Sequence, residues 1–113
     1  MMESNRQQKI NRLIQKELSE IFLLETKKMH GVFISVTNVR VSPDLGIAHA
    51  YLSIFPSDNA EMLITNINDN VKSLRYDLGK RVGKQLRVIP ELTFHLDDSL
   101  DYIENIDRLL KND

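Results

Sequence analysis

The chain has 113 residues, 42% of them hydrophobic, which suffices for one ordinary core and predicts a single domain over residues 1–113. The chain has fifteen Lys and Arg residues and sixteen Asp and Glu residues, which gives a net charge of −1. Any nucleic acid or membrane would therefore have to be recognised by locally clustered charge. The absence of cysteine excludes disulfides and thiolate zinc sites. With neither a signal peptide's apolar stretch nor the roughly 18 apolar residues of a membrane span, we expect a soluble cytoplasmic protein.

The N-terminal segment has the apolar spacing of a long helix, which we predict over residues 5–25. Its apolar stripe comprises Ile10, Leu13, Ile14, Leu18, Ile21 and Phe22. At 100° per residue, Lys9, Arg12 and Lys16 fall opposite this stripe, while Arg6 lies nearer its edge in the first turn. The first helix is therefore expected to carry a short basic ridge.

Two segments rich in β-branched or alternating apolar residues follow and predict a hairpin. Residues 31–41 form the first strand, 42–46 a tight turn containing Pro, Asp and Gly, and 47–55 the returning strand. In the returning strand the alternation places its four apolar residues on one face: Ala48, Ala50, Leu52 and Ile54. The two small alanines would let a helix lie close to the sheet.

The remainder of the chain predicts helix, strand and helix. Apolar residues three or four apart indicate a second long helix, either straight or bent, from Ala60 to about Lys84. Alternation over 86–96 predicts a half-buried strand, in which Pro90 must lie at an edge or a strand start. Ser99 begins a last predicted helix. The order α-β-β-α-β-α predicts an α+β fold of two layers, with helices on one face of a three-stranded sheet.

Charge is unevenly distributed along this chain. Residues 72–87 contain six basic side chains and one acid, a local net charge of +5, whereas residues 91–113 contain seven acids and two bases, a net charge of −5. Cations clustered on a helix and the following turn attract phosphate through counterion release. The basic residues in question are Lys72, Arg75, Lys80, Arg81, Lys84 and Arg87.

A structural explanation of this segment stays open beside the functional one. Charge runs are commonly solvated helix faces. Gly79 and Gly83, which are costly inside a helix, indicate a bend, the end of the helix or the close approach of another backbone. All six basic residues are candidates for phosphate contacts, and some are expected to be structural instead. Arg75 and Arg81 are the first candidates for a structural role, because an unbroken helix places each near an edge of its apolar stripe.

The order α-β-β-α-β is that of the type II KH RNA-binding fold. Two stretches narrow the match, "NVRVSPDLGIAHAYLSIF" and "LRYDLGKRVGKQLRVIPELTFHLDDSLDYIENIDRLL". Their most specific parts are Ser42-Pro43-Asp44-Leu45 with Ala48, Leu74-Arg75, and Pro90-Glu91-Leu92-Thr93-Phe94 through Asp97, Ser99 and Leu100. With these motifs, nearly the whole chain resembles the ribosome-binding factor A family.

The resemblance implies a KH-like fold and binding to 16S rRNA within the small (30S) ribosomal subunit during late maturation, a role often tied to growth in the cold. Two features depart from the KH and family patterns. The Gly-x-x-Gly loop of standard KH domains is missing. The family bends its second helix at an Ala-x-Gly, whereas the matching stretch here is Asn70-Val71-Lys72, which leaves the position of the bend open.

An enzyme is not expected, because the sequence shows no catalytic constellation. His30, His49 and His95 are scattered over predicted loop and strands, and Asp97, Asp98 and Asp101 suit the first turn of the last helix better than a magnesium site. No metal or cofactor is expected. The aromatic residues occupy mostly predicted core positions, so base stacking is expected to be minor.

We therefore hypothesise a non-enzymatic assembly factor, a monomer when free, that positions itself on RNA backbone. The alternative is a protein-interaction module without direct RNA binding, which salt would distinguish because phosphate contacts weaken steeply with ionic strength. The predicted RNA-binding residues are Lys72, Arg75, Lys80, Arg81, Lys84 and Arg87, with Arg6, Lys9, Arg12 and Lys16 as a weaker second patch.

Overall fold

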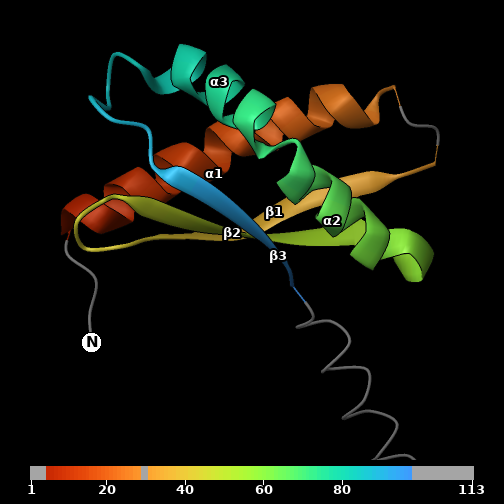
Figure 1. The fold of residues 1–113 in the computed structure, drawn as a ribbon. Coiled ribbons are helices and arrows are strands. Elements are labelled where there is room, and N and C mark those ends of the chain that lie inside the picture. Colours follow the sequence, from red (N-terminus) through yellow and green to blue (C-terminus); the bar gives the residue numbers. More distant parts are fainter. Residues whose placement is uncertain (1–4, 29–30, 98–113) are drawn as a thin grey trace, which may run out of the picture.

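The computed structural model describes residues 5–28 and 31–97, which form a three-stranded sheet and its covering helices (Figure 1). The elements in chain order are α1 (Asn5–Thr26), β1 (Phe33–Val41), β2 (Ile47–Phe55), the short 3-10 helix η1 (Ser57–Asn59), α2 (Ala60–Asp69), α3 (Val71–Val82) and β3 (Glu91–Leu96). No helix among these described residues has the length and apolar character to cross a membrane. The predicted helix after Ser99 lies outside the described residues.

The sheet has the strand order β1-β2-β3, with β1 antiparallel and β3 parallel to the central β2. The register pairs Val39 with Ala50, and Ala50 in turn with Phe94, so buried side chains from all three strands meet in one row. Helices α1, α2 and α3 lie on the same face of this sheet (Figure 1). The predicted α+β, KH-like two-layer fold is confirmed.

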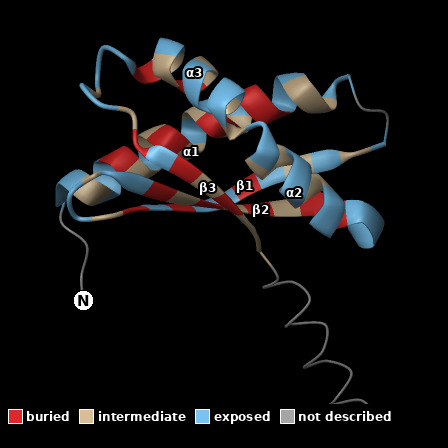
Figure 2. Ribbon diagram, viewed as in Figure 1, coloured by how far each residue is buried: buried red, intermediate tan, exposed pale blue. Residues whose placement is uncertain are grey.

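The core fills the space between the helices and the sheet (Figure 2). The predicted alternation in β2 is confirmed, because Ala48, Ala50, Leu52 and Ile54 are all buried there. Phe22 of α1 meets Phe94 of β3 edge to face, with ring centroids 5.7 Å apart. Such aromatic pairs add to the stabilisation from burial.

The predicted second helix is in fact two helices, separated at Asn70. The side-chain amide of Asn70 donates to the carbonyl of Asn66 at 2.9 Å, and its backbone N–H reaches the carbonyls of Asn66 and Ile67. Asparagine side chains compete with regular helical hydrogen bonding in this way. The break therefore lies at Asn70, within the stretch Asn70-Val71-Lys72 where the sequence leaves the position of the bend open, and α3 ends at Val82 rather than at Lys84.

The third strand is shorter than predicted. It begins at Glu91, and Val88 before it is 71% exposed. Pro90 is the cause, because it has no N–H to donate to a ladder, and pairing starts one residue later where the Glu91 N–H donates to the carbonyl of Gly46 at 2.9 Å. Residues 83–90 are thus a connection that folds back beside α3 before entering β3 (Figure 1).

Candidate nucleic-acid interface

One face of α3 combines positive charge with an aromatic ring. Lys72, Tyr76 and Lys80 follow one another at four-residue steps, which places them in a row along the helix. Gly83 ends the helix, and the chain then turns so that Arg87 and Val88 come to lie opposite this row. Sequence-distant cations are therefore gathered at one place.

Between α3 and the returning segment lies an open hollow of about 700 Å³, here called the cationic hollow. Of the six basic residues predicted in this part of the chain, four line the hollow. Its lining comprises Lys72, Arg75, Tyr76, Gly79, Lys80, Arg87, Val88 and Ile89. Lys72, Lys80 and Arg87 are exposed, and the described residues provide none of these three with an ion pair.

Arg75 forms the wall of the cationic hollow. Its Nε donates to the carbonyl of Pro90 at 3.2 Å and its Nη2 to the carbonyl of Ile89 at 2.6 Å. This guanidinium clamps the connection against α3 and satisfies two carbonyls just ahead of β3. The connection also packs closely on α3 at Gly79, where a Cβ would make an ordinary 3.5 Å contact with the Cγ1 of Ile89. The structural role predicted for Arg75 is confirmed.

Arg81 points toward α1 instead of the hollow. Its Nη1 lies 2.8 Å from the carboxylate of Glu20 and 3.3 Å from that of Glu17. The pairing joins α3 to α1 and neutralises the arginine locally. The structural role predicted for Arg81 is therefore also confirmed.

Tyr76 is the feature that sequence reasoning missed. We expected the aromatic residues mostly in the core, and this is wrong: Tyr76 is 66% exposed, Phe33 and Phe55 are similarly exposed, and among the described aromatic residues only Phe22 and Phe94 are buried. The Lys80 ammonium lies 4.6 Å from the centroid of the Tyr76 ring. The four-residue spacing of Lys72, Tyr76 and Lys80 is the sequence pattern that could have predicted an exposed tyrosine beside the two lysines.

A second hollow of about 460 Å³ extends the basic surface toward the β1–β2 turn. Arg87 borders both hollows, and Arg6 of α1 lines the second one, so two arginines far apart in the sequence line one hollow. Asp44 also lines it, and hydrogen bonds from the Ser42 hydroxyl and then the Gly46 N–H lower the pKa of its carboxyl. This acid lies within an otherwise basic surface.

The other predicted contact residues do not join either hollow. Lys84 is exposed in the turn after α3. Lys9, Arg12 and Lys16 are exposed on α1, on the side away from its buried residues Ile10 and Ile14. The predicted second patch is thus divided, because Arg6 belongs with Arg87 while the remaining three form a separate ridge.

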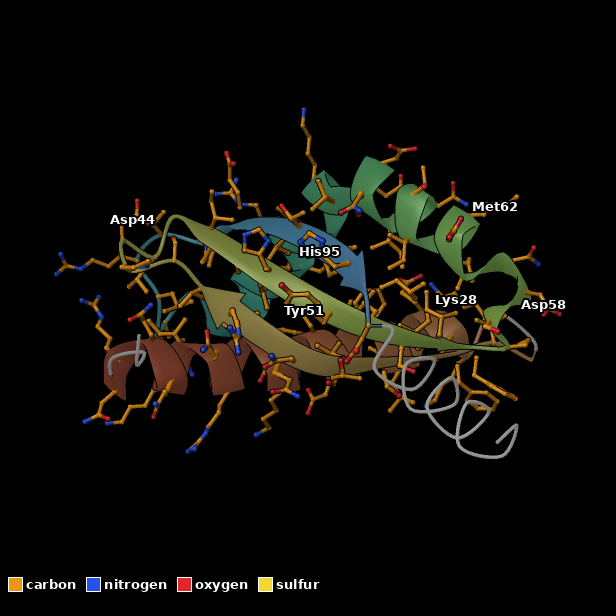
Figure 3. All side chains as sticks on the ribbon, turned by 90° about the horizontal axis from the view of Figure 1, so that it is seen from below. Lys28, Asp44, Tyr51, Asp58, Met62 and His95 are labelled. Atoms are coloured by element: carbon orange, nitrogen blue, oxygen red, sulfur yellow. The ribbon has the colours of Figure 1, made fainter. Side chains whose placement is uncertain are left out.

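The histidines are not scattered as predicted. His49 of β2 and His95 of β3 lie on neighbouring strands with Nδ1 and Nε2 2.9 Å apart, and the ring of Tyr51 stacks on His95. These rings stand on the sheet face that the helices leave uncovered, where Figure 3 labels Tyr51 and His95. Within residues 5–28 and 31–97, no group of three side chains is arranged to hold a metal ion. His30 lies outside those residues.

Comparison with known proteins agrees with this architecture. A family model described as ribosome-binding factor A matches residues 6–110. The chain belongs to the ribosome-binding factor A family. It is 49% identical to the ribosome-binding factor A of Cytophaga hutchinsonii, over 96% of this chain and 83% of that protein, and 47% identical to that of Flavobacterium psychrophilum, over 96% and 85%.

Solved structures of ribosome-binding factor A share the fold. The crystal structure of the Thermus thermophilus protein superposes with a TM-score of 0.65 at 20% identity, covering 80% of this chain and 94% of that one. A homology model of the Thermus thermophilus protein, fitted into a cryo-EM map of its complex with the 30S subunit, superposes with a TM-score of 0.61 at 21% identity, covering 78% of this chain and 91% of that one.

Proposed function

We propose that this protein binds the small (30S) ribosomal subunit through its 16S rRNA and acts as a non-enzymatic assembly factor during late maturation. Membership of the ribosome-binding factor A family supports the ribosomal partner, as does the 30S complex described for the Thermus thermophilus protein. Such a role would be carried out in the cytoplasm, by a protein that is monomeric until it binds.

The observation that carries the RNA contact is the cationic hollow. Three exposed cations, Lys72, Lys80 and Arg87, surround an exposed tyrosine and form no ion pair with any residue that the structure describes. Cations of this kind neutralise phosphates and release counterions, which supplies affinity without reading sequence. Tyr76 adds a flat apolar surface on which an unpaired base can stack.

Arg75 and Arg81 have a smaller part in this proposal. The guanidinium of Arg75 is engaged by two carbonyls, and that of Arg81 by two carboxylates. A group already paired within the protein gains less from a phosphate than an unpaired one does. The phosphate contacts that contribute most to RNA affinity are therefore expected from Lys72, Lys80 and Arg87. Arg6 extends this surface, and Lys84 lies at its margin.

The test is co-sedimentation with purified small subunits at two salt concentrations. We compare wild type with K72E/K80E/R87E and with K9E/R12E/K16E, a control that introduces the same change in charge on the α1 ridge. If three phosphates are contacted, tenfold more salt lowers wild-type affinity by about 2 to 3 orders of magnitude. The hollow variant should lose binding, and the ridge variant, which changes the weaker predicted patch, should lose much less of it. Unchanged binding of the hollow variant, or equal loss in both variants, would reject the hollow as the RNA site.

A further inference from the structure

The opposite side of α3 borders a different kind of hollow. It has a volume of about 380 Å³ and lies where α2 meets α3, near Asn70. Apolar side chains from α1, β1, α2 and α3 form most of its lining, and this is the size range in which protein pockets begin to hold ligands. The apolar residues are Phe22, Ile34, Leu63, Ile67 and Leu74.

Two carboxylates stand at the edge of this acid-rimmed hollow, Glu25 from α1 and Asp77 from α3. Both residues are half-buried. Within the described part of the chain, neither carboxylate has an ion pair or a side-chain hydrogen bond. A carboxylate that is partly withdrawn from water and unpaired gains from a cation more than a fully exposed one does.

Charge distinguishes the occupants that this surface could accept. Nucleic acid is disfavoured, because a phosphate brought beside Glu25 and Asp77 meets two like charges in a partly desolvated site. An uncharged apolar ligand would fill the hollow but leave both carboxylates unpaired. A polypeptide that presents one apolar side chain between basic residues satisfies the apolar lining and the acidic rim together.

We propose that the acid-rimmed hollow binds a short basic segment of another protein, with one apolar side chain inserted between Phe22, Leu63 and Leu74. Lys or Arg residues on either side of this anchor pair with Glu25 and Asp77. The site is separate from the cationic hollow, because Ser73, Leu74 and Asp77 line one side of α3 while Lys72, Tyr76 and Lys80 line the other. The protein could therefore hold RNA and a basic protein at the same time.

The test uses fluorescein-labelled synthetic peptides in which Lys and Arg flank a single anchor that is Leu, Ile, Met or Phe. Fluorescence anisotropy measures binding, and NMR spectra of the full chain locate it. We expect at least one anchor to bind and to shift signals of Leu63 and Leu74. E25Q/D77N should weaken binding roughly three- to tenfold, as loss of two partly exposed ion pairs implies. Replacing the anchor by Ser in the peptide should weaken it about tenfold, since that removes the buried apolar group.

D58K/E61K is the matched control for the charge-reversing variant E25K/D77K, because Asp58 and Glu61 line a different hollow beside β2. Only E25K/D77K should abolish binding. The proposal is overturned if no anchor binds at millimolar peptide, if both charge-reversed variants lose binding equally, or if a single-stranded RNA oligonucleotide shifts Leu63 and Leu74 in place of the peptides.

Discussion

The two sides of α3 carry opposite chemistry although they belong to one helix of 12 residues. One side, with Lys72, Tyr76 and Lys80, faces the cationic hollow, and the other, with Leu74 and Asp77, faces the acid-rimmed hollow. The comparison shows that a net charge summed along the chain can mislead. Residues 72–87 sum to +5, yet the only acid among them marks a surface of different function.

The two sides also differ in how they are held. The cationic hollow depends on a connection without regular structure, which Arg75 clamps to α3. The acid-rimmed hollow is built from side chains of α1, β1, α2 and α3, which share the core. Substitutions can therefore disturb the first hollow while leaving the second in place.

The largest effect is expected from Arg75→Ala. Loss of both hydrogen bonds from a charged donor should lower the free energy of unfolding by about 2 kcal/mol, measured by urea denaturation. It should also weaken RNA binding, because the connection that carries Arg87 is released from α3. Lys80→Ala is the control, since an exposed side chain of this kind should change stability by less than about 0.5 kcal/mol. Equal stability of the two variants would show that the clamp contributes nothing.

Tyr76→Ala should leave the free energy of unfolding nearly unchanged and weaken binding to the small subunit roughly tenfold, because a stacked base is lost. Tyr76→Phe keeps the ring and should bind like wild type. Both affinities can be measured by sedimentation at fixed salt. If Tyr76→Ala binds the small subunit with full affinity while K72E/K80E/R87E does not bind, the interface consists of phosphate contacts without a stacked base.

Gly79 inside α3 and Gly83 directly after it should respond to substitution in opposite directions. Gly79→Ala should stabilise the protein by about 1 kcal/mol, since a Cβ would make an ordinary 3.5 Å contact with Ile89 inside a helix. Gly83→Ala should destabilise it, because a Cβ there would lie 2.7 Å from the carbonyl oxygen of Gly79. Thermal denaturation measures both changes. A loss of stability in Gly79→Ala would mean that the connection packs more tightly on α3 than described.

The smallest effect concerns Asp44, the acid on the basic surface. Ser42→Ala removes the main hydrogen bond that lowers its pKa, so the pKa should rise toward the ordinary value of 3.8. Because the folded pKa lies below the unfolded one, the stabilisation is present above the unfolded pKa and disappears as pH falls through the folded pKa. NMR titration of the carboxyl carbon measures the shift. If the pKa of Asp44 is unchanged in Ser42→Ala, the backbone hydrogen bonds alone, mainly that from the Gly46 N–H, lower it.

Local periodicity was sufficient to predict much of the fold. The predicted first helix, residues 5–25, corresponds to Asn5–Thr26, and the predicted strand 47–55 has the same bounds in the structure. Patterns of this kind succeed because burial on one face imposes a period of 3.6 or 2 on the sequence itself. The same reasoning placed Arg75 and Arg81 at the margin of the apolar stripe, where both are found in structural pairings.

Boundaries and aromatic positions were predicted less well. The third strand was placed too early because alternation continues through 88–90, although Pro90 delays the first ladder bond to Glu91. Most aromatic side chains were predicted to lie at core positions, yet Phe33 and Phe55 are exposed on the sheet. Residue type alone does not say which face of an element is covered.

From the amino-acid order one can read the two-layer architecture, the concentration of cations between residues 72 and 87, and the family. The surroundings of those cations could not be read from it. Arg81 meets Glu17 and Glu20, Arg87 lines one hollow with Arg6, and Asp77 lines a different hollow from Lys80. These arrangements involve residues up to 81 positions apart (87 − 6). Electrostatic interaction depends on distance and solvent exposure in space, and neither quantity exists until the helices have packed on the sheet.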